Sequence, residues 1–194
     1  MKAVLISIQP KWCKLIASGK KTIEVRKTKP KLETPFKVYI YETKTPLRWN
    51  KAHNDIIGGE GGFVIGEFVC DYVTTTCGRR LYALAGPWSK RAHRDTTLPE
   101  DACLSIDEII DYAGGKNKFV YGWHIYDLVI YDKPKPLKSF QKPCVCTDEY
   151  EGEEYHNCLF CELAGDSDYG IVACNRPITR APQSWCYVEE LKDA

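Results

Sequence analysis

GKKTIEVR, residues 19–26, marks the point at which a predicted helix gives way to a predicted strand. Gly19 suits the left-handed conformation that commonly follows a helix end. In residues 22–26, polar and apolar side chains alternate, which is the period of a strand with one apolar face. Glu24 and Arg26 share the polar face, roughly 7 Å apart along the chain. The stretch therefore predicts a helix end, a short strand and two opposite charges side by side.

The residues before this stretch predict a buried strand followed by a short helix. Residues 3–8 are apolar almost throughout, and Pro10 suits the first turn of a helix. Trp12, Leu15 and Ile16 then recur at helical spacing. We expect these three side chains to pack into the core.

Several more strands and one further helix are predicted downstream. Ser105 and Glu108 form a capping-box pattern, which predicts a helix over residues 106–112. β-branched and aromatic residues predict strands over residues 36–42, 63–73 and 119–132. Short strands with few helices favour an α+β fold, in the form of a small, partly closed β-barrel with flanking helices.

The Lys-Pro-Lys-Pro run at residues 133–136 indicates a boundary in the chain. We predict a barrel domain over residues 1–137 and a cysteine-rich C-terminal extension over residues 138–194 that packs on it. The chain has 194 residues, of which 44% are hydrophobic, so it has the material for one proper core.

The amino-terminal apolar stretch is too short for the core of a signal peptide. No run approaches the roughly 18 apolar residues of a membrane span. We therefore expect a soluble cytoplasmic protein without a membrane partner.

Charge is distributed unevenly along the chain, although the formal net charge is only +1. Residues 1–37 contain ten Lys or Arg against two Glu, whereas residues 147–169 contain eight Asp or Glu and no Lys or Arg. The basic end suits phosphate and the acidic end repels it. A nucleic acid or a nucleotide is the ligand class that this distribution favours.

Ten cysteines in a reducing compartment favour thiols or metal ligands over disulfides. Five of them crowd into residues 144–174, within an acidic stretch that has few large aliphatic residues. One CxC and one CxxC are enough for a tetrahedral structural zinc site. The alternative is a set of free thiols in a small hydrophobic subdomain. The predicted zinc ligands are Cys146, Cys158, Cys161 and Cys174, with Cys144 as a substitute.

The octet fits the pattern G-x-K-x-x-E-x-R, and it follows a strand, an S-I-x-P turn at residues 7–10 and a helix. With residues 64–67 (VIGE) and 121–124 (YGWH), it resembles the ASCH family of the PUA-like superfamily, over roughly residues 1–137. The phrase at residues 176–188 resembles the C-terminal part of prophage-encoded ASCH-like proteins. The resemblance implies a PUA-like barrel with a cleft beside the first helix and the motif strand, which binds RNA or a modified nucleoside.

An acid beside a fork-shaped base can read the donor and acceptor edge of a nucleobase. The alternative is a surface ion pair worth about 0–1 kcal/mol, with solvated lysines around it. Trp12, Tyr41 and Trp123 are candidates for stacking on a base. The helical stripe favours the core for Trp12, and the strand face of Trp123 equally suits the barrel interior. The predicted binding residues are Gly19, Lys20, Lys21, Thr22, Glu24, Arg26 and Trp123.

Some ASCH-like proteins resemble amidohydrolases that remove an acyl group from an N4-acylated cytidine, using a lysine and a threonine of this motif. Lys21 matches that lysine, but Glu24 occupies the place of the threonine. Lys21 and Glu24 are the catalytic candidates if the protein is an enzyme. We rank binding above catalysis, and a protein-interaction adaptor is the third alternative.

Overall fold

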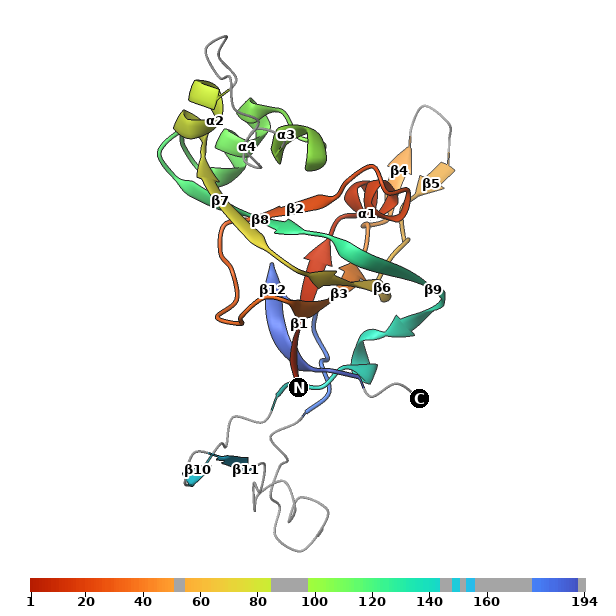
Figure 1. The fold of residues 1–194 in the computed structure, drawn as a ribbon. Helices are drawn as coiled ribbons and strands as arrows, with labels where there is room; N and C mark the ends of the chain where they lie inside the picture. Colours follow the sequence, from red (N-terminus) through yellow and green to blue (C-terminus); the bar gives the residue numbers. More distant parts are fainter. Residues whose placement is uncertain (51–54, 85–97, 144–147, 151–152, 156–175, 192–194) are drawn as a thin grey trace, which may run out of the picture.

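The computed structural model describes residues 1–50, 55–84, 98–143, 148–150, 153–155 and 176–191. Within these residues, a five-stranded sheet has the order β12-β1-β3-β6-β9, and a three-stranded sheet has the order β2-β8-β7 (Figure 1). The larger sheet contains β1 (Lys2–Ile8), β3 (Phe36–Glu42), β6 (Phe63–Cys70), β9 (Tyr126–Pro136) and β12 (Trp185–Glu189). The smaller sheet contains β2 (Ile23–Arg26), β7 (Val73–Cys77) and β8 (Phe119–His124).

Helices and short hairpins complete the described fold, which is mixed α+β and mostly sheet. The helices are α1 (Pro10–Ala17), α2 (Gly78–Leu84), α3 (Leu98–Asp101), α4 (Ile106–Ala113) and the 3-10 turn η1 (Leu137–Ser139). The hairpins pair β4 (Arg48–Asn50) with β5 (Asp55–Ile57), and β10 (Asp148–Tyr150) with β11 (Glu153–Tyr155). Helices α2, α3 and α4 gather at one end of the β2-β8-β7 sheet (Figure 1).

Two long predicted strands each divide between the two sheets. The predicted strand 63–73 becomes β6 in the larger sheet, and β7 follows it in the smaller sheet. The predicted strand 119–132 becomes β8 and β9, and the break falls at Ile125. Gly122 lies inside β8. A Cβ added there would come 2.5 Å from Leu98 Cδ1, so the absence of a side chain allows β8 to pack closely against α3.

The sheets of the described residues do not close into the barrel that the sequence predicts. β2 pairs with β8, and β9 lies at the open edge of the larger sheet. The chain passes between the sheets at the β6–β7 and β8–β9 junctions, so the sheets are joined by covalent connections. The physical reason is that the chain leaves one sheet and joins the other at each junction, so the strand pairing does not continue around a closed ring.

The core has three clusters, and β1 is buried on both faces. Val4 and Ile6 belong to the first cluster, with α1 and Trp123. Ala3 and Leu5 belong to the second cluster, on the other face of the larger sheet. A strand buried on both faces reads as a continuous apolar run, which is how residues 3–8 appear in the sequence.

The third cluster fixes the orientation of β2. Ile23 and Val25 pack against the helical end, where Leu98 and Ile109 are fully buried. Because side chains alternate along a strand, Glu24 and Arg26 point to the opposite side. The predicted strand face is thus confirmed, and the helices are the reason for its direction.

Two predicted helix ends are confirmed. Ser105 Oγ accepts from the Glu108 backbone N at 3.1 Å, and Glu108 Oε2 accepts from the Ser105 backbone N at 2.8 Å, which completes the capping box. Gly19 has φ +71°, the left-handed conformation expected after α1.

Strand β12 returns from the C-terminal part of the chain and pairs antiparallel with β1. Trp185 and Tyr187 of β12 pack against the first core cluster. Residues near the chain end therefore lie beside the first strand and beside the loop that follows β2. Among the described helices, none is long and apolar enough to cross a membrane.

Candidate functional site

A pocket of about 660 Å³ opens beside the polar face of β2. Residues from the end of β1 and the start of α1 form one wall, and Leu104, Glu108 and Tyr112 form another. Residues 182–184, just before β12, complete the lining. Four segments that are distant in sequence therefore meet around Glu24 and Arg26.

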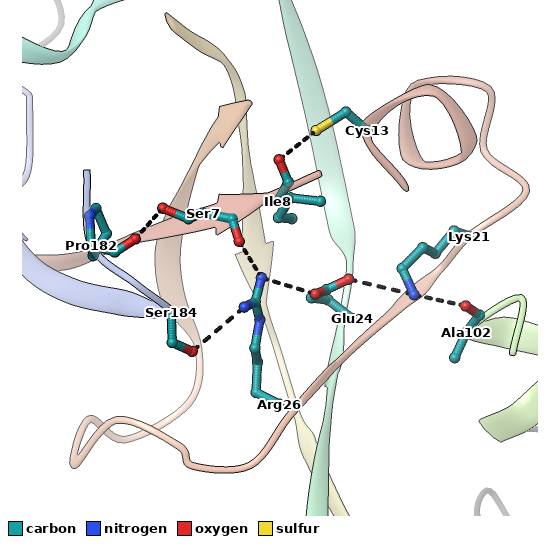
Figure 2. Close-up of polar contacts among 9 residues, drawn as sticks. All are labelled: Ser7, Ile8, Cys13, Lys21, Glu24, Arg26, Ala102, Pro182 and Ser184. Atoms are coloured by element: carbon teal, nitrogen blue, oxygen red, sulfur yellow. Dashed lines mark hydrogen bonds and ion pairs between the residues drawn. The ribbon is translucent and has the colours of Figure 1, made fainter. Parts of the chain in front are cut away.

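Arg26 is the most extensively bound side chain of this pocket. Its Nη2 lies 3.0 Å from Glu24 Oε1 and donates to the Ser7 carbonyl at 2.6 Å (Figure 2). Its Nη1 lies 3.5 Å from Ser184 Oγ. The guanidinium thus links β2 to β1 and to the segment before β12. Its Nε is buried and has no hydrogen-bond partner among the described residues.

Lys21 lies on the other side of the Glu24 carboxylate. Lys21 Nζ is 3.4 Å from Glu24 Oε2 and donates to the Ala102 carbonyl at 2.7 Å (Figure 2). Only 2% of Lys21 is exposed, and this burial lowers the pKa of its ammonium. One carboxylate is therefore held between two cations, an arrangement that Figure 2 shows as a continuous row.

This burial corrects the alternative in which the motif is a surface ion pair with solvated lysines. Lys21 is not solvated, because the Ala102 carbonyl and Glu24 occupy its ammonium. The ion pair of Glu24 and Arg26 is not a surface pair, because their side chains are only 8% and 10% exposed. The array is a buried one, so its charges interact far more strongly than exposed ones would.

Trp12 and Tyr112 supply the aromatic surface of the pocket. Trp12 is half-buried against the core, and Lys11 Nζ lies 4.2 Å from its ring centroid. Tyr112 is 37% exposed on α4. Burial raises the pKa of the Tyr112 hydroxyl, against the opposing effect of Arg26. Both rings therefore combine an accessible apolar surface with a nearby cation.

Trp123 has no exposed surface and belongs to the core. Its ring contacts Phe36 edge-on at a centroid distance of 5.8 Å and lies 6.0 Å from the Trp185 ring. A base cannot stack on a ring that the core covers on all sides. The stacking role expected for Trp123 is therefore corrected, because its strand face is the core face.

The remaining predicted binding residues support the pocket from outside its lining. Gly19 ends α1, and Lys20 is exposed while its carbonyl accepts from Cys103 Sγ at 3.3 Å. The Thr22 backbone N donates to the Asp101 carbonyl at 2.8 Å. Of the predicted set, the structure brings together in the pocket lining Lys21, Glu24 and Arg26.

Sequence reasoning missed the residues that reach the pocket from elsewhere in the chain. Ser184 and Tyr112 are remote from β2 in sequence and have no local pattern that marks them. Ser7 contributes through its backbone carbonyl, which no side-chain motif signals. Lys11 had a usable signal, since it directly follows the turn at residues 7–10. Trp12 was a stacking candidate for which the sequence favoured the core, and its half-buried ring both lines the pocket and packs against the first core cluster.

The predicted zinc ligands Cys144, Cys146, Cys158, Cys161 and Cys174 lie outside the described residues. Within the part of the chain that the structure describes, no group of three or more His, Cys, Asp or Glu side chains is placed to hold a metal ion.

The described residues form a mixed α+β domain with a pocket beside the first helix and the motif strand. The ASCH domain family model matches residues 6–161, so the chain belongs to the ASCH family. This family is generally associated with nucleic-acid binding. No curated protein matches the chain.

Solved structures show the same fold. The crystal structure of an ASCH protein from Zymomonas mobilis is 18% identical, covers 97% of this chain and 88% of its own, and has a TM-score of 0.54. A serine-to-alanine mutant of that protein is also 18% identical, with coverage of 97% and 89% and a TM-score of 0.55. A tyrosine-to-phenylalanine mutant of the same protein is 18% identical, covers 98% of this chain and 92% of its own, and has a TM-score of 0.54. At this identity the likeness concerns the fold alone.

Proposed function

We propose that this protein binds a nucleotide, free or within RNA, with its base in the pocket beside β2. The observation that carries the proposal is the buried row of Lys21, Glu24 and Arg26 at the pocket, flanked by the rings of Trp12 and Tyr112. The volume of about 660 Å³ is in the ordinary range of small-ligand sites.

The energetics of the buried charges support a binding role. A buried ion pair is often no more stabilising than apolar residues of the same volume, because desolvation offsets the attraction. The array of Glu24 and its two cations is therefore poorly explained by stability alone. Charged groups with shifted pKa values cluster at functional sites, and the pKa of Lys21 is lowered by burial.

The hydrogen-bonding capacity that remains at the array suits the edge of a base. Glu24 has acceptor positions beyond the two ion pairs, since a carboxylate offers about four lone-pair sites. Arg26 keeps a buried Nε without a partner in the described residues. A donor and an acceptor side by side match the edge of a nucleobase, and such charge-assisted hydrogen bonds are the stronger kind.

The aromatic rings and the charge balance complete the match. Stacking on Trp12 or Tyr112 contributes typically about 1–3 kcal/mol per base. The charged lining residues are Lys11, Lys21 and Arg26 against Glu24 and Glu108. One excess positive charge favours a ligand with a base and few phosphates over a polyphosphate.

The test substitutes an aromatic residue at the pocket, because substitutions in the buried array would destabilise the fold. Purified protein is titrated with the four ribonucleoside monophosphates by calorimetry and by NMR shifts. Tyr112→Leu is expected to weaken binding at least severalfold, and the control Tyr126→Leu, at a 59% exposed tyrosine on β9, is expected to leave it unchanged. Equal affinity in both variants, or no binding by the unmodified protein at high nucleotide concentration, contradicts the proposal.

A second candidate is hydrolysis of an N4-acylated cytidine, and one observation favours it. Lys21 Nζ lies 3.4 Å from the Glu24 carboxylate, so an ammonium and a candidate general base lie side by side at the pocket. In this alternative Glu24 activates water and Lys21 stabilises the oxyanion. The test measures release of the small acid from acylated cytidines, which Lys21→Met should abolish. A panel without turnover rejects this function.

Two further predictions from the sequence, a zinc-binding C-terminal extension and a cytoplasmic location, are proposals as well. We propose that residues 138–194 form an extension that holds structural zinc through the C-terminal cysteines. We also propose a cytoplasmic location, where those cysteines meet reducing conditions. A role as a protein-interaction adaptor has no specific observation in its favour.

A further inference from the structure

A basic segment leaves the pocket directly after Arg26. It reads Lys27-Thr28-Lys29-Pro30-Lys31, with a lysine at every second position, and we call residues 27–31 the basic ribbon. All three lysines are exposed. Between them, Pro30 is buried, and Thr28 is exposed but its Oγ1 accepts from Trp185 Nε1 at 3.0 Å. The ribbon is therefore attached to the protein through Thr28 and Pro30, while its lysines remain exposed.

The ribbon is held in place by strand β12. Besides the bond from Trp185 to Thr28, the Lys31 backbone N donates to the Tyr187 hydroxyl at 2.7 Å. Leu32, the next residue, packs against the first core cluster. A segment fixed at both ends loses less conformational entropy when a ligand binds than a free loop does.

The ribbon lysines have no carboxylate partner within ion-pair distance among the described residues. Two of them lie near aromatic rings instead. Lys27 Nζ is 5.2 Å from the Tyr112 ring centroid, and Lys29 Nζ is 6.0 Å from that of Tyr121. Tyr112 also lines the pocket, so the ribbon begins at the pocket itself.

Proteins that bind single-stranded nucleic acid combine cations with neighbouring aromatic rings. Cations track the phosphates, while rings offer a face to the bases. Successive lysines of the ribbon are at most about 7 Å apart along an extended chain, and their long side chains adapt to neighbouring phosphates. An ordinary solvated lysine face has no reason to be anchored on its inner side or to start at a pocket.

We propose that the basic ribbon guides the backbone of single-stranded RNA away from the pocket, so that the ligand is an oligonucleotide with one base held at Glu24 and Arg26. This inference rests on the proposed function, because it takes the pocket as the place of that base. It adds that phosphates next to the bound nucleotide contact Lys27, Lys29 and Lys31.

The experiment measures fluorescence anisotropy with labelled single-stranded RNA of mixed sequence and of roughly two, four and eight nucleotides. The test variant combines Lys27→Gln, Lys29→Gln and Lys31→Gln. The matched control combines Lys118→Gln, Lys133→Gln and Lys138→Gln, which remove the same charge from exposed positions elsewhere. Binding of the nucleoside monophosphates is measured on all three proteins by NMR.

The expected result is an affinity that rises with RNA length for the unmodified protein and for the control, but not for the ribbon variant. The slope of log affinity against log salt should fall by about 2 in the ribbon variant, since each phosphate contact on a single strand contributes about 0.7. Monophosphate binding should persist in all three proteins, and the ribbon variant should lose much less affinity for monophosphates than for the longest RNA.

Two kinds of failure are distinguishable. If monophosphates bind but longer RNA binds no better, or if the ribbon variant behaves like the control, the ribbon is not an RNA path and the pocket proposal stands. If the unmodified protein binds neither monophosphates nor RNA, the proposed function itself fails. Duplex RNA that binds as tightly as single strands overturns the assignment to single-stranded RNA.

Discussion

The Arg26 guanidinium lies 3.0 Å from the Glu24 carboxylate, and both side chains are about nine-tenths buried. Arg26 also reaches the Ser7 carbonyl and Ser184, while Glu24 reaches Lys21. The same contacts therefore shape the pocket and join β2 to β1, to the segment before β12 and to the loop before α4. A change to these residues should therefore affect both stability and the proposed ligand binding.

Glu24→Gln is expected to destabilise the protein by about 3–5 kcal/mol, because it leaves two buried cations without their counter-charge. The side chain keeps its size, so lost packing contributes little. Urea unfolding followed by fluorescence measures the change. The control is Glu33→Gln, at an exposed position after the basic ribbon, where the expected change is within about 0.5 kcal/mol. Equal stability of the two variants would mean that the negative charge of Glu24 contributes little to the stability of the fold.

Lys21 should make the stability of the protein depend on pH in the alkaline range. Burial lowers the pKa of Lys21 in the folded protein from the ordinary 10.5, so the unfolded chain binds this proton more tightly. By linkage, the Lys21 contribution to stability rises as pH increases from the lowered folded pKa to the unfolded value. The stability of the unmodified protein relative to Lys21→Met should therefore increase with pH over the alkaline range that ends at the ordinary lysine pKa of 10.5.

Unfolding is measured by denaturant titration at several pH values within this range. Lys20→Met, at the exposed neighbour of Lys21, controls for the loss of one positive charge. The comparison between variants is needed because tyrosines of the unfolded chain lose their protons at about pH 10, whereas burial raises the pKa of Tyr39 and Tyr41 in the folded protein. A difference that is flat with pH would contradict a lowered Lys21 pKa.

Cys13 and Cys70 should resist alkylation in the native protein. Burial raises the pKa of each thiol to about 12, and the thiolate is the reactive form. Cys77 and Cys103 are partly exposed and should react first. Mass spectrometry after timed exposure to iodoacetamide reads each site. Early modification of Cys13 without loss of structure would show that α1 opens away from β1.

The local patterns of the sequence predicted the parts of this fold that depend on local chemistry. The alternation in residues 22–26 placed Glu24 and Arg26 on one face, and the capping box at Ser105 located α4. A two-residue period or a capping pair is contained in neighbouring residues, so no tertiary information is needed.

The partners of those residues could not be predicted, because they come from far along the chain. Lys21 meets the carbonyl of Ala102 across 81 positions, and Arg26 meets Ser184 across 158. Trp123 was ambiguous because both faces of its strand carry apolar residues, and only the position of Phe36 identifies the core face. Whether two sheets close into a barrel likewise depends on pairings that no single strand specifies.

The zinc prediction rests on the sequence alone, since its cysteines lie outside the described residues. Five cysteines fall within residues 144–174 of an acidic stretch that has little apolar surface to bury. Thiolates in a CxC and a CxxC should hold about one zinc per chain, and such a site supplies folding energy that this stretch otherwise lacks. Elemental analysis of protein purified without chelator measures the metal.

Removal of the metal should make the chain after Pro143 more sensitive to protease while the two main sheets stay folded, because those sheets have their own buried clusters. Cys158→Ser with Cys161→Ser should reproduce this effect and lose the zinc. Cys77→Ser with Cys103→Ser, at partly exposed thiols outside the cluster, should retain it. Protein that contains no stoichiometric zinc, and whose C-terminal region is cleaved equally with and without chelator, would leave these cysteines as ordinary thiols.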